Sequence, residues 1–269
     1  MLARLYTKLC DAYPRFRKAT RKQMYQLLAG YYQKQDWTFM NYGYAPDHHT
    51  EVPDLHPHDE INRYCIQLYH HVANAINLKE LKVLEVGSGR GGGAHYIKRY
   101  LHPKEMVGVD FSNNAVSLCQ GHYNVEGLRF MHGDAENLPF DDESFDAVVN
   151  VESSHCYGSM ATFLAQVTRV LRPGGHFLFA DFRNHEHLTT LDEQLENTGM
   201  QRVKQKDITP NVIEALDADH AHRIEQIRNG APKILDKLLK EFAGTKGAGI
   251  YEAFKNRNVV YQSFVLQKA

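Results

Sequence analysis

Short apolar runs alternate with longer stretches of helical periodicity from residue 81 onward, and this alternation limits the folds open to the chain. The apolar runs lie at 81–87, 106–110, 128–132, 145–152 and 175–182. The helical stretches between them lie at 91–101, 113–123 and 159–171. Runs that are buried on both faces and alternate with helices predict a parallel sheet in an α/β sandwich. A weaker run at 200–208 and a final one at 259–267 extend the predicted sheet, and the last strand closes its edge.

The segments that flank this core have a different composition. Residues 1–36, the basic arm, carry leucines at helical spacing, and the pattern predicts two short amphipathic helices separated at Pro14. Two interpretations of the basic arm stay open: a solvated face over a packed apolar stripe, or a weak peripheral contact with an anionic membrane. Residues 37–60 are typical of an ordered loop, whereas 61–78 and 211–243 are typical of helices.

Composition and charge exclude several classes of protein. The 269 residues carry 31 Lys and Arg against 32 Asp and Glu, a net charge of -1, whereas a protein held to nucleic acid by its overall charge is strongly basic. No apolar run reaches the roughly 18–20 residues that span a bilayer, and Arg4, Lys8 and Asp11 interrupt any signal peptide. The four cysteines are scattered, as is typical of a reducing compartment. We therefore expect a cytoplasmic protein with no nucleic-acid partner and no transmembrane segment.

Residues 85–93 form a glycine-rich turn between a buried strand and a helix. Glycines let the backbone approach a ligand closely and adopt dihedral angles that other residues avoid. The N-terminus of the helix that follows favours a negatively charged group. The turn alone does not identify the ligand, because nicotinamide and flavin enzymes share it. Asp110 ends the next strand, 21 residues after Gly89, where an acid can accept hydrogen bonds from both hydroxyls of a ribose.

Further short motifs accompany the predicted strands. They are V-G-V-D at 107–110, G-D-A-E-N-L-P-F at 133–140, F-D-A-V at 145–148 and L-R-P-G-G at 171–175. Together with E-V-G-S-G-R-G at 85–91, this set resembles the class I S-adenosylmethionine-dependent methyltransferases over roughly residues 80–182. Within that superfamily the chain is similar to small-molecule enzymes of the ubiquinone, menaquinone and sterol type. It is similar in particular to the phthiotriol/phenolphthiotriol dimycocerosate O-methyltransferases, and this likeness includes E-S-S-H-C-Y at 152–157.

The resemblance implies an architecture. It implies a Rossmann-like, doubly wound, mostly parallel seven-stranded sheet whose last strand is antiparallel. It also divides the chain into an N-terminal helical and loop lid at 1–78, a cofactor-binding core at 79–208, a helical substrate lid at 209–257 and the last core strand at 258–269. We expect the two lid segments to meet over the cofactor and to enclose a hydrophobic acceptor. The oligomeric state stays open.

The resemblance also implies roles in an S-adenosylmethionine site. Gly87, Ser88 and Gly89 would line the methionine part of the cofactor, and Glu85 would act on its ammonium group. Asp110 would hold the ribose. The residues expected around the adenine are Phe111, Asp134, Ala135 and Glu136, and the residue expected near the sulfonium is Asn150.

Two residues that follow the fourth predicted strand are candidates for the chemical step. Methyl transfer needs alignment, and a hydroxyl acceptor must also lose its proton, for which a placed base adds roughly 10²–10⁴-fold. His155 is the first candidate for this base, because histidine titrates near neutral pH, and Glu152 is the second. The alternatives are packing against the cofactor for His155 and a supporting or surface role for Glu152.

The loop at 37–60 combines histidines, acids and aromatic residues. Its four histidines between residues 48 and 58 match no standard spacing of metal ligands, so we expect no metal site. Tyr42 and Tyr44 would place aromatic rings over the sulfonium, where a cation–π contact contributes about 0.5–2 kcal/mol. Ordinary packing is the alternative for both tyrosines.

These observations favour one function over several rivals. We expect S-adenosylmethionine-dependent methyl transfer to a hydroxyl oxygen of a hydrophobic or lipid-like small molecule. The alternatives are C- or N-methylation of another small molecule, or a protein that binds the cofactor without transferring methyl, as a cyclisation catalyst or binding module. A nicotinamide dehydrogenase is a further rival, for which the sequence offers no recognisable catalytic set.

Overall fold

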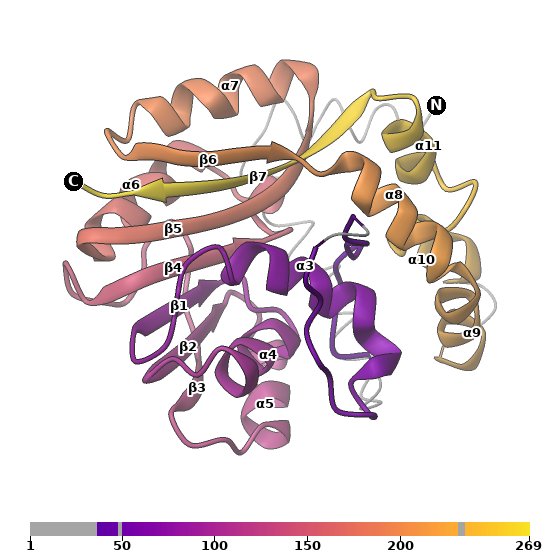
Figure 1. Ribbon diagram of the computed structural model, residues 1–269, viewed down its shortest axis with the longest axis horizontal. Helices are drawn as coiled ribbons and strands as arrows, with labels where there is room; N and C mark the ends of the chain where they lie inside the picture. The colour runs from indigo at the N-terminus through magenta and orange to yellow at the C-terminus, as the bar shows by residue number, and fades with distance from the viewer. Residues whose placement is uncertain (1–36, 48–49, 231–234) are drawn as a thin grey trace.

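The computed structural model describes residues 37–47, 50–230 and 235–269, and the basic arm lies outside them. Within the described residues seven strands form one sheet, in the order β3-β2-β1-β4-β5-β7-β6 (Figure 1). Their bounds are β1 Lys82–Val86, β2 Glu105–Asp110, β3 Leu128–His132, β4 Phe145–Val151, β5 Leu171–Asn184, β6 Gln201–Asp207 and β7 Val259–Gln267. Strands β1 to β5 pair in parallel, and β7 runs antiparallel between β5 and β6. The predicted mostly parallel sheet with an antiparallel last strand is confirmed. The prediction that the last strand closes the edge is wrong, because β7 pairs with both β5 and β6 and leaves β6 at the edge.

Helices connect the strands and cover both faces of the sheet. Their bounds are η1 Glu60–Asn62, α3 Arg63–Ala73, α4 Gly92–Tyr100, α5 Asn113–His122, η2 Ser154–Cys156, α6 Met160–Val170, α7 His185–Glu196, α8 Thr209–Ala218, α9 His220–Gly230, α10 Asp236–Phe242 and α11 Gly249–Lys255. Helices α4, α5 and α6 begin and end within one residue of their predicted limits. The sequence pattern does not predict α7, because this mostly polar helix buries only Leu191 and Leu195.

Alternate side chains of the strands pack against different helices. Along β1, Val83 joins an apolar cluster with residues of α3, α4 and α8, whereas the next residue, Leu84, joins a cluster with residues of α6 and α7. Successive side chains of a strand point to opposite faces of its sheet. Because helices cover both faces, the sequence of the strand is a continuous run of apolar residues and not an alternation of apolar and polar residues.

The fifth strand begins earlier than its sequence predicts. The L-R-P-G-G motif at 171–175 lies inside β5: Leu171 pairs with Phe145, and the next paired residue is His176, opposite Ala147. The residues between them therefore bulge out of the ladder. Gly174 has a φ of 77° in this bulge, a conformation that glycine adopts without strain.

The loop at 37–47 packs against the helical insertion formed by α8 to α11. Arg223 of α9 is buried and donates hydrogen bonds to the carbonyl oxygens of Asn41 at 3.2 Å, Tyr42 at 3.1 Å and Ala243 at 3.0 Å. Asp219 accepts a hydrogen bond from its Nε at 2.9 Å and balances its charge. One buried guanidinium thus joins the described part of the N-terminal segment to the insertion.

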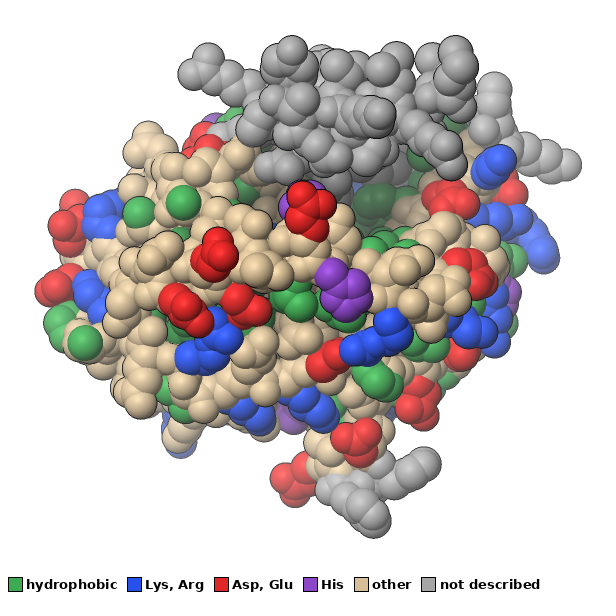
Figure 2. Space-filling view, turned by 90° about the horizontal axis from the view of Figure 1, so that it is seen from above, with side chains coloured by type: hydrophobic (Ala, Val, Ile, Leu, Met, Phe, Trp, Pro, Cys, Tyr) green, Lys and Arg blue, Asp and Glu red, His purple; other side chains and the backbone are tan. Residues whose placement is uncertain are grey.

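The surface agrees with the balanced composition. On the face in Figure 2, the basic and acidic side chains of the described residues are interspersed. None of the helices in the described part of the chain is both long and apolar enough to cross a membrane. The described residues contain no group of three potential metal ligands. In the 37–60 loop, Asp59 accepts hydrogen bonds from Arg99 at 2.9 Å and Tyr100 at 2.5 Å.

Contact between α3 and α4 generates a stability prediction. A Cβ on Gly93 of α4 would lie 2.1 Å from ring carbons of Tyr69, whose hydroxyl donates to buried Glu85 at 2.7 Å and holds the ring in place. We expect Gly93→Ala to lower the free energy of unfolding by about 1–3 kcal/mol through overpacking. Urea denaturation followed by circular dichroism measures this change.

Gly121 of α5 provides the matched control. A Cβ there meets no heavy atom within 4 Å. Because alanine favours the helix over glycine, we expect Gly121→Ala to raise the free energy of unfolding by about 0.5–1 kcal/mol. Equal effects of the two substitutions would contradict the packing of Tyr69 on Gly93.

Candidate active site

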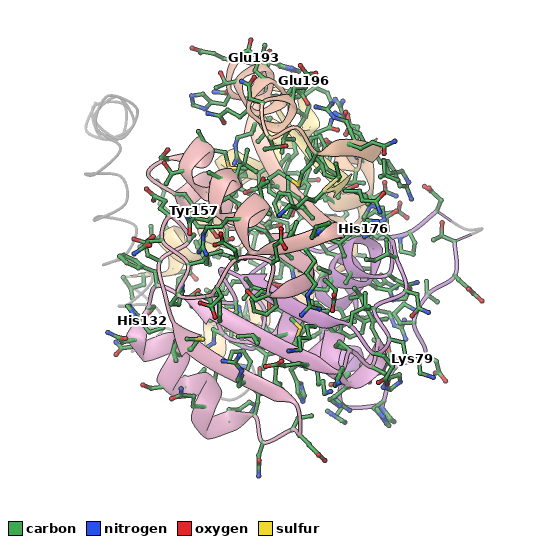
Figure 3. All side chains as sticks on the ribbon, turned by 90° about the vertical axis from the view of Figure 1, so that its left-hand side faces the viewer. Lys79, His132, Tyr157, His176, Glu193 and Glu196 are labelled. Carbon is green, nitrogen blue, oxygen red and sulfur yellow. The ribbon has the colours of Figure 1, made fainter. Side chains whose placement is uncertain are left out.

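A cavity of about 410 Å³ lies beyond the ends of β1, β2 and β4. Its volume falls within the range of small-molecule pockets. In Figure 3 Tyr157, which lines the cavity, lies toward the same side as His132 at the end of β3. Lys79 before β1 and His176 near the start of β5 lie toward the other side of that view. Ligands of open α/β sheets bind outside the carboxyl ends of the strands, which is where this cavity lies.

The glycine-rich turn forms one wall of the cavity. The N–H groups of Gly87 and Ser88 both donate to the carbonyl oxygen of Val109 in β2, at 2.8 and 3.0 Å. Gly87 has a φ of 78°, and a Cβ there would lie 2.3 Å from Ser153 Oγ, so a side chain at this position would clash with the loop after β4. Ser88 lines the cavity, and its buried Oγ has no hydrogen-bond partner among the described residues.

Asp110 stands beside this turn at the end of β2. Its Oδ2 accepts the N–H of Gly89 and its Oδ1 accepts the N–H of Ser112, both at 2.8 Å. Burial raises the pKa of Asp110, and the two backbone hydrogen bonds oppose that effect. Each carboxylate oxygen keeps a lone pair, so the group can accept two further hydrogen bonds from a ligand.

The predicted site residues divide into two groups by location. Those that line the cavity are Tyr42, Gly87, Ser88, Gly89, Asp110, Phe111, Asp134, Ala135, Glu152 and His155. Glu85, Glu136 and Asn150 lie outside its lining. Glu85 is buried behind Tyr69, which does line it, while Glu136 accepts the N–H of Gly158 at 2.9 Å. The Asn150 amide donates to the carbonyl oxygen of Val86 at 2.8 Å, so it holds β4 against β1.

Tyr44 also lies away from the cavity, unlike Tyr42. Its ring stacks on His71 with centroids 4.4 Å apart, and Lys206 Nζ lies 6.0 Å from its centroid. Gly43, between the two tyrosines, has a φ of 85° and turns the chain. The left-handed turn directs the two side chains to different neighbours, so the cation–π role expected of Tyr44 is not supported by its position.

Glu152 and His155 line the cavity together near Phe182 and Phe242. Glu152 has a φ of 48°, which is rare outside glycine, and its Oε1 accepts the N–H of Tyr42 at 2.8 Å. Burial raises the pKa of Glu152 to about 8, although the hydrogen bond from Tyr42 opposes the rise. Strained backbone of this kind clusters at functional sites.

His155 pairs with a carboxylate that the sequence did not indicate. Its Nδ1 lies 2.8 Å from Oδ1 of Asp181, at the carboxyl end of the parallel strand β5. Burial disfavours the imidazolium, but the neighbouring Cys156 and Asp181 side chains favour it more, and the pKa of His155 rises to about 9. The position of Asp181 in the sequence could have indicated it, because Asp181 follows the apolar residues of a predicted strand, as Asp110 does.

Comparison with known proteins identifies the family. Residues 84–179 match the methyltransferase domain family. A phthiotriol/phenolphthiotriol dimycocerosates methyltransferase of Mycobacterium leprae is 37% identical over 86% of this chain and 85% of that protein. The chain belongs to this methyltransferase family. A fatty-acid O-methyltransferase of Mycolicibacterium smegmatis is 35% identical over 92% of this chain and 89% of that protein.

Solved structures share the fold of this methyltransferase. The [4+2]-cyclase SpnF aligns with a TM-score of 0.68 at 18% identity, covering 91% of this chain and 94% of that one. The cyclopropane synthase MmaA2 of Mycobacterium tuberculosis aligns with a TM-score of 0.64 at 17% identity, covering 87% and 94%. At these identities the likeness concerns the fold, which is Rossmann-like. The family makes this chain an S-adenosylmethionine-dependent methyltransferase.

The cavity fits this cofactor on two observations. The Oγ of Ser88 is buried and unpartnered among the described residues, so a polar ligand group there would relieve the cost of its burial. Asp110 offers two acceptor lone pairs at the end of β2, where a ribose binds in folds of this class. Both features serve a nucleoside that carries a polar amino-acid tail.

The position of Asp110 generates a binding prediction. Asp110→Ala removes both acceptors and leaves the ribose hydroxyls poorly paired. We expect S-adenosylmethionine affinity to fall roughly ten- to a hundredfold, about 1.5–3 kcal/mol, by calorimetry on the folded variant. Asp142→Ala is the control, because that exposed carboxylate pairs with Arg169 away from the cavity and its loss should leave affinity unchanged. Unchanged affinity in Asp110→Ala would reject the site.

Buried Glu85 generates a pH prediction. Burial raises the pKa of Glu85 from 4.5 to about 8, while the Tyr69 hydroxyl opposes the rise. Between these pH values the folded chain keeps a proton that the unfolded chain releases, so this group makes the free energy of unfolding fall as pH rises from about 4.5 to 8. Glu85→Gln lacks this contribution. We therefore expect the free energy of unfolding of Glu85→Gln, minus that of the unsubstituted protein, to increase from pH 5 to pH 8.

Denaturation of the cofactor-free protein across this pH range measures the difference. Tyr69→Phe is the companion variant: it removes the hydrogen bond that favours the ionised carboxyl, so the loss of stability should extend to higher pH. Parallel pH profiles for the unsubstituted protein and Glu85→Gln would show that Glu85 is ionised when folded.

Proposed function

We propose that this methyltransferase methylates a hydroxyl oxygen of a hydrophobic, lipid-like small molecule. The observation that carries the proposal is the composition of the cavity beside His155 and Glu152, where Tyr42, Phe182 and Phe242 supply ring surface around two titratable side chains. Apolar walls with a few polar anchors suit an acceptor of this kind. The names of the two relatives, a dimycocerosates methyltransferase and a fatty-acid O-methyltransferase, support a lipid-like acceptor and transfer to oxygen.

The cofactor contacts follow from the same cavity. Asp110 would accept hydrogen bonds from the ribose, Phe111 would pack on the adenine, and Asp134 and Ala135 would bind its amino group. Gly87, Ser88 and Gly89 line the methionine part. Tyr69 would contact the ammonium group, and Glu85 lies behind it as the acceptor of its hydroxyl. Glu136 and Asn150 act as supports of the surrounding loops, because their hydrogen bonds go to the protein.

Bound S-adenosylmethionine supplies a methyl group that the sulfonium has already activated. The residues of the chain align the acceptor and remove its proton. His155 accepts that proton, and it loses its own proton more easily beside a sulfonium, because two positive charges repel. Glu152 is the second candidate for the base, since its raised pKa lies near neutral pH.

Enclosure of the acceptor completes the proposal. Tyr42 of the N-terminal loop and Phe242 and Ile250 of the insertion line the cavity, so both segments contribute to its walls. We assign them to a lid that excludes water from the aligned reactants. The weak membrane contact proposed for the basic arm concerns residues outside those described. We keep the expectation of a cytoplasmic location from the sequence alone, because the scattered cysteines form no disulfide framework of the kind typical of secreted proteins.

An acceptor assay tests the function. The protein is incubated with methyl-labelled S-adenosylmethionine and, separately, a long-chain alcohol, a long-chain fatty acid and a long-chain amine, and mass spectrometry locates the label. The proposal expects an ether product and release of S-adenosylhomocysteine. A methyl ester alone would move the acceptor class to carboxylates, and label on nitrogen or carbon would reject O-methylation.

His155 generates the kinetic prediction. If His155 is the base, His155→Ala should lower kcat by roughly 10²–10⁴-fold and leave cofactor affinity near that of the unsubstituted protein. His176→Ala is the matched control, because His176 lies near the start of β5 and does not line the cavity. A loss of cofactor affinity with normal turnover at saturation would assign His155 to packing instead.

A further inference from the structure

Asp181 is a buried carboxylate that is bonded to several groups beside the cavity. Its Oδ2 accepts the Ser154 hydroxyl at 2.6 Å and the backbone N–H of His155 at 2.9 Å. Its Oδ1 accepts the backbone N–H of Phe182 at 2.8 Å and contacts His155 Nδ1 at 2.8 Å. Arg183 Nη1 lies 3.2 Å from Oδ2. An ion buried this deeply is retained only when charges and hydrogen bonds of this kind compensate for its lost hydration.

These contacts keep Asp181 ionised. Burial alone would raise its pKa, but the charges of Arg183 and His155, with the hydrogen bonds from His155 and Ser154, hold the pKa of Asp181 well below its ordinary value. An ionised carboxylate is only an acceptor, so the ring nitrogen that faces it must carry a proton. Asp181 therefore selects the form of His155 that has its proton on Nδ1.

Packing fixes the plane of the same ring. The imidazole of His155 lies on Phe182, with centroids 4.5 Å apart and the two planes inclined by 34°. The backbone N–H of His155 is bonded to the carboxylate that bonds its side chain, so main chain and ring are held by one group. Asp181 occupies Nδ1, so Nε2 is the nitrogen that a ligand in the cavity can use, in competition with the Cys156 side chain, which also hydrogen-bonds to His155.

We propose that Asp181 is a positioning residue for methyl transfer, which holds His155 with its proton on Nδ1 so that Nε2 receives the proton of the acceptor hydroxyl. This inference rests on the proposed function, transfer to a hydroxyl oxygen. The O–H bond breaks as the O–C bond forms, and the S–C bond breaks with its electron pair left on sulfur. The proton passes to Nε2, the resulting imidazolium is balanced by Asp181, and solvent takes the proton afterwards.

The other charged and titratable groups around His155 define the competing explanations. Glu152 and Cys156 line the same cavity, and Arg183 binds Asp181 and the Ser154 hydroxyl. His155 is bonded to Asp181, whereas Glu152 is not: its Oε1 accepts the backbone N–H of Tyr42, in the 37–47 loop. If Glu152 were the base, substitution of Asp181 would change the acceptor reaction little, and substitution of Glu152 would move the pH dependence.

The test is Asp181→Asn, which preserves shape but removes the charge. We expect kcat to fall by roughly 10²–10⁴-fold, with the acceptor KM and the cofactor Kd within about threefold of the unsubstituted values. We also expect the rising limb of the pH–kcat profile to move to lower pH by about 1–3 units, because an opposite charge next to His155 has been removed. A residue with only a structural role would not move that limb.

Asp207→Asn is the matched control. Asp207 also ends a strand, accepts the N–H of Thr209 at 2.9 Å and pairs with Arg257, but it does not line or adjoin the cavity. Its substitution should leave kcat and the pH profile unchanged. A folded Asp181→Asn protein whose pH profile matches the unsubstituted one overturns the proposal, as does a profile that moves for Glu152→Gln and not for Asp181→Asn.

A measurement on the unsubstituted protein keeps the proposal falsifiable if Asp181→Asn does not fold. Nitrogen-15 NMR of the histidine rings, with His155 assigned from its absence in His155→Ala, should show a proton on Nδ1 in the neutral ring. A proton on Nε2 instead would overturn the inference. If no acceptor hydroxyl is methylated, the proposed function fails, and the NMR measurement still tests whether Asp181 sets the proton on Nδ1. If methylation occurs but the pH–kcat profile of Asp181→Asn is unchanged, only the role of Asp181 fails.

Discussion

The carbonyl oxygen of Val109 accepts the N–H groups of both Gly87 and Ser88, and the shape of the cavity depends on this connection between β1 and β2. It closes the turn after β1 tightly enough that Gly89 N–H reaches the carboxylate of Asp110 at 2.8 Å. Asp110 thus organises the turn while keeping acceptor capacity for a ligand. A side chain at Gly87 would meet Ser153 and separate the turn from the loop after β4, where His155 lies.

The part of the cavity wall around His155 depends on a different interaction, the compensation of buried charge. Asp181, His155 and Arg183 form a compact group in which each ion has an opposite partner, whereas Glu152 is kept partly protonated near neutral pH by burial. The loop over the site takes part, because the N–H of Tyr42 donates to Glu152 while its carbonyl oxygen accepts from Arg223. Packing of the 37–47 loop against α9 is therefore coupled through Tyr42 to the electrostatics of the site.

Much of the architecture could be predicted because its signals are local. The apolar runs and the residues after them encode strands that end at one edge, so Gly87, Asp110 and Asp134 come together wherever such a sheet forms. The limits of α4 and α5 follow from periodicity in the same way. The sequence did not predict helix α7, because few of its residues are apolar. It did not predict the bulge at the start of β5 either, because the pairing between strands defines a bulge and local sequence does not.

The sequence by itself thus determined the sheet, the glycine-rich turn and the cofactor, since each depends on residues close together in the chain. Only the tertiary structure decided which side chains reach the cavity and what charge they carry. Tyr42 and Tyr44 are separated by the left-handed turn at Gly43, and Glu85 is buried behind Tyr69. Asp181 meets His155 across 26 positions of sequence. Burial and partners far apart in the chain set such positions and protonation states, and no local pattern records them.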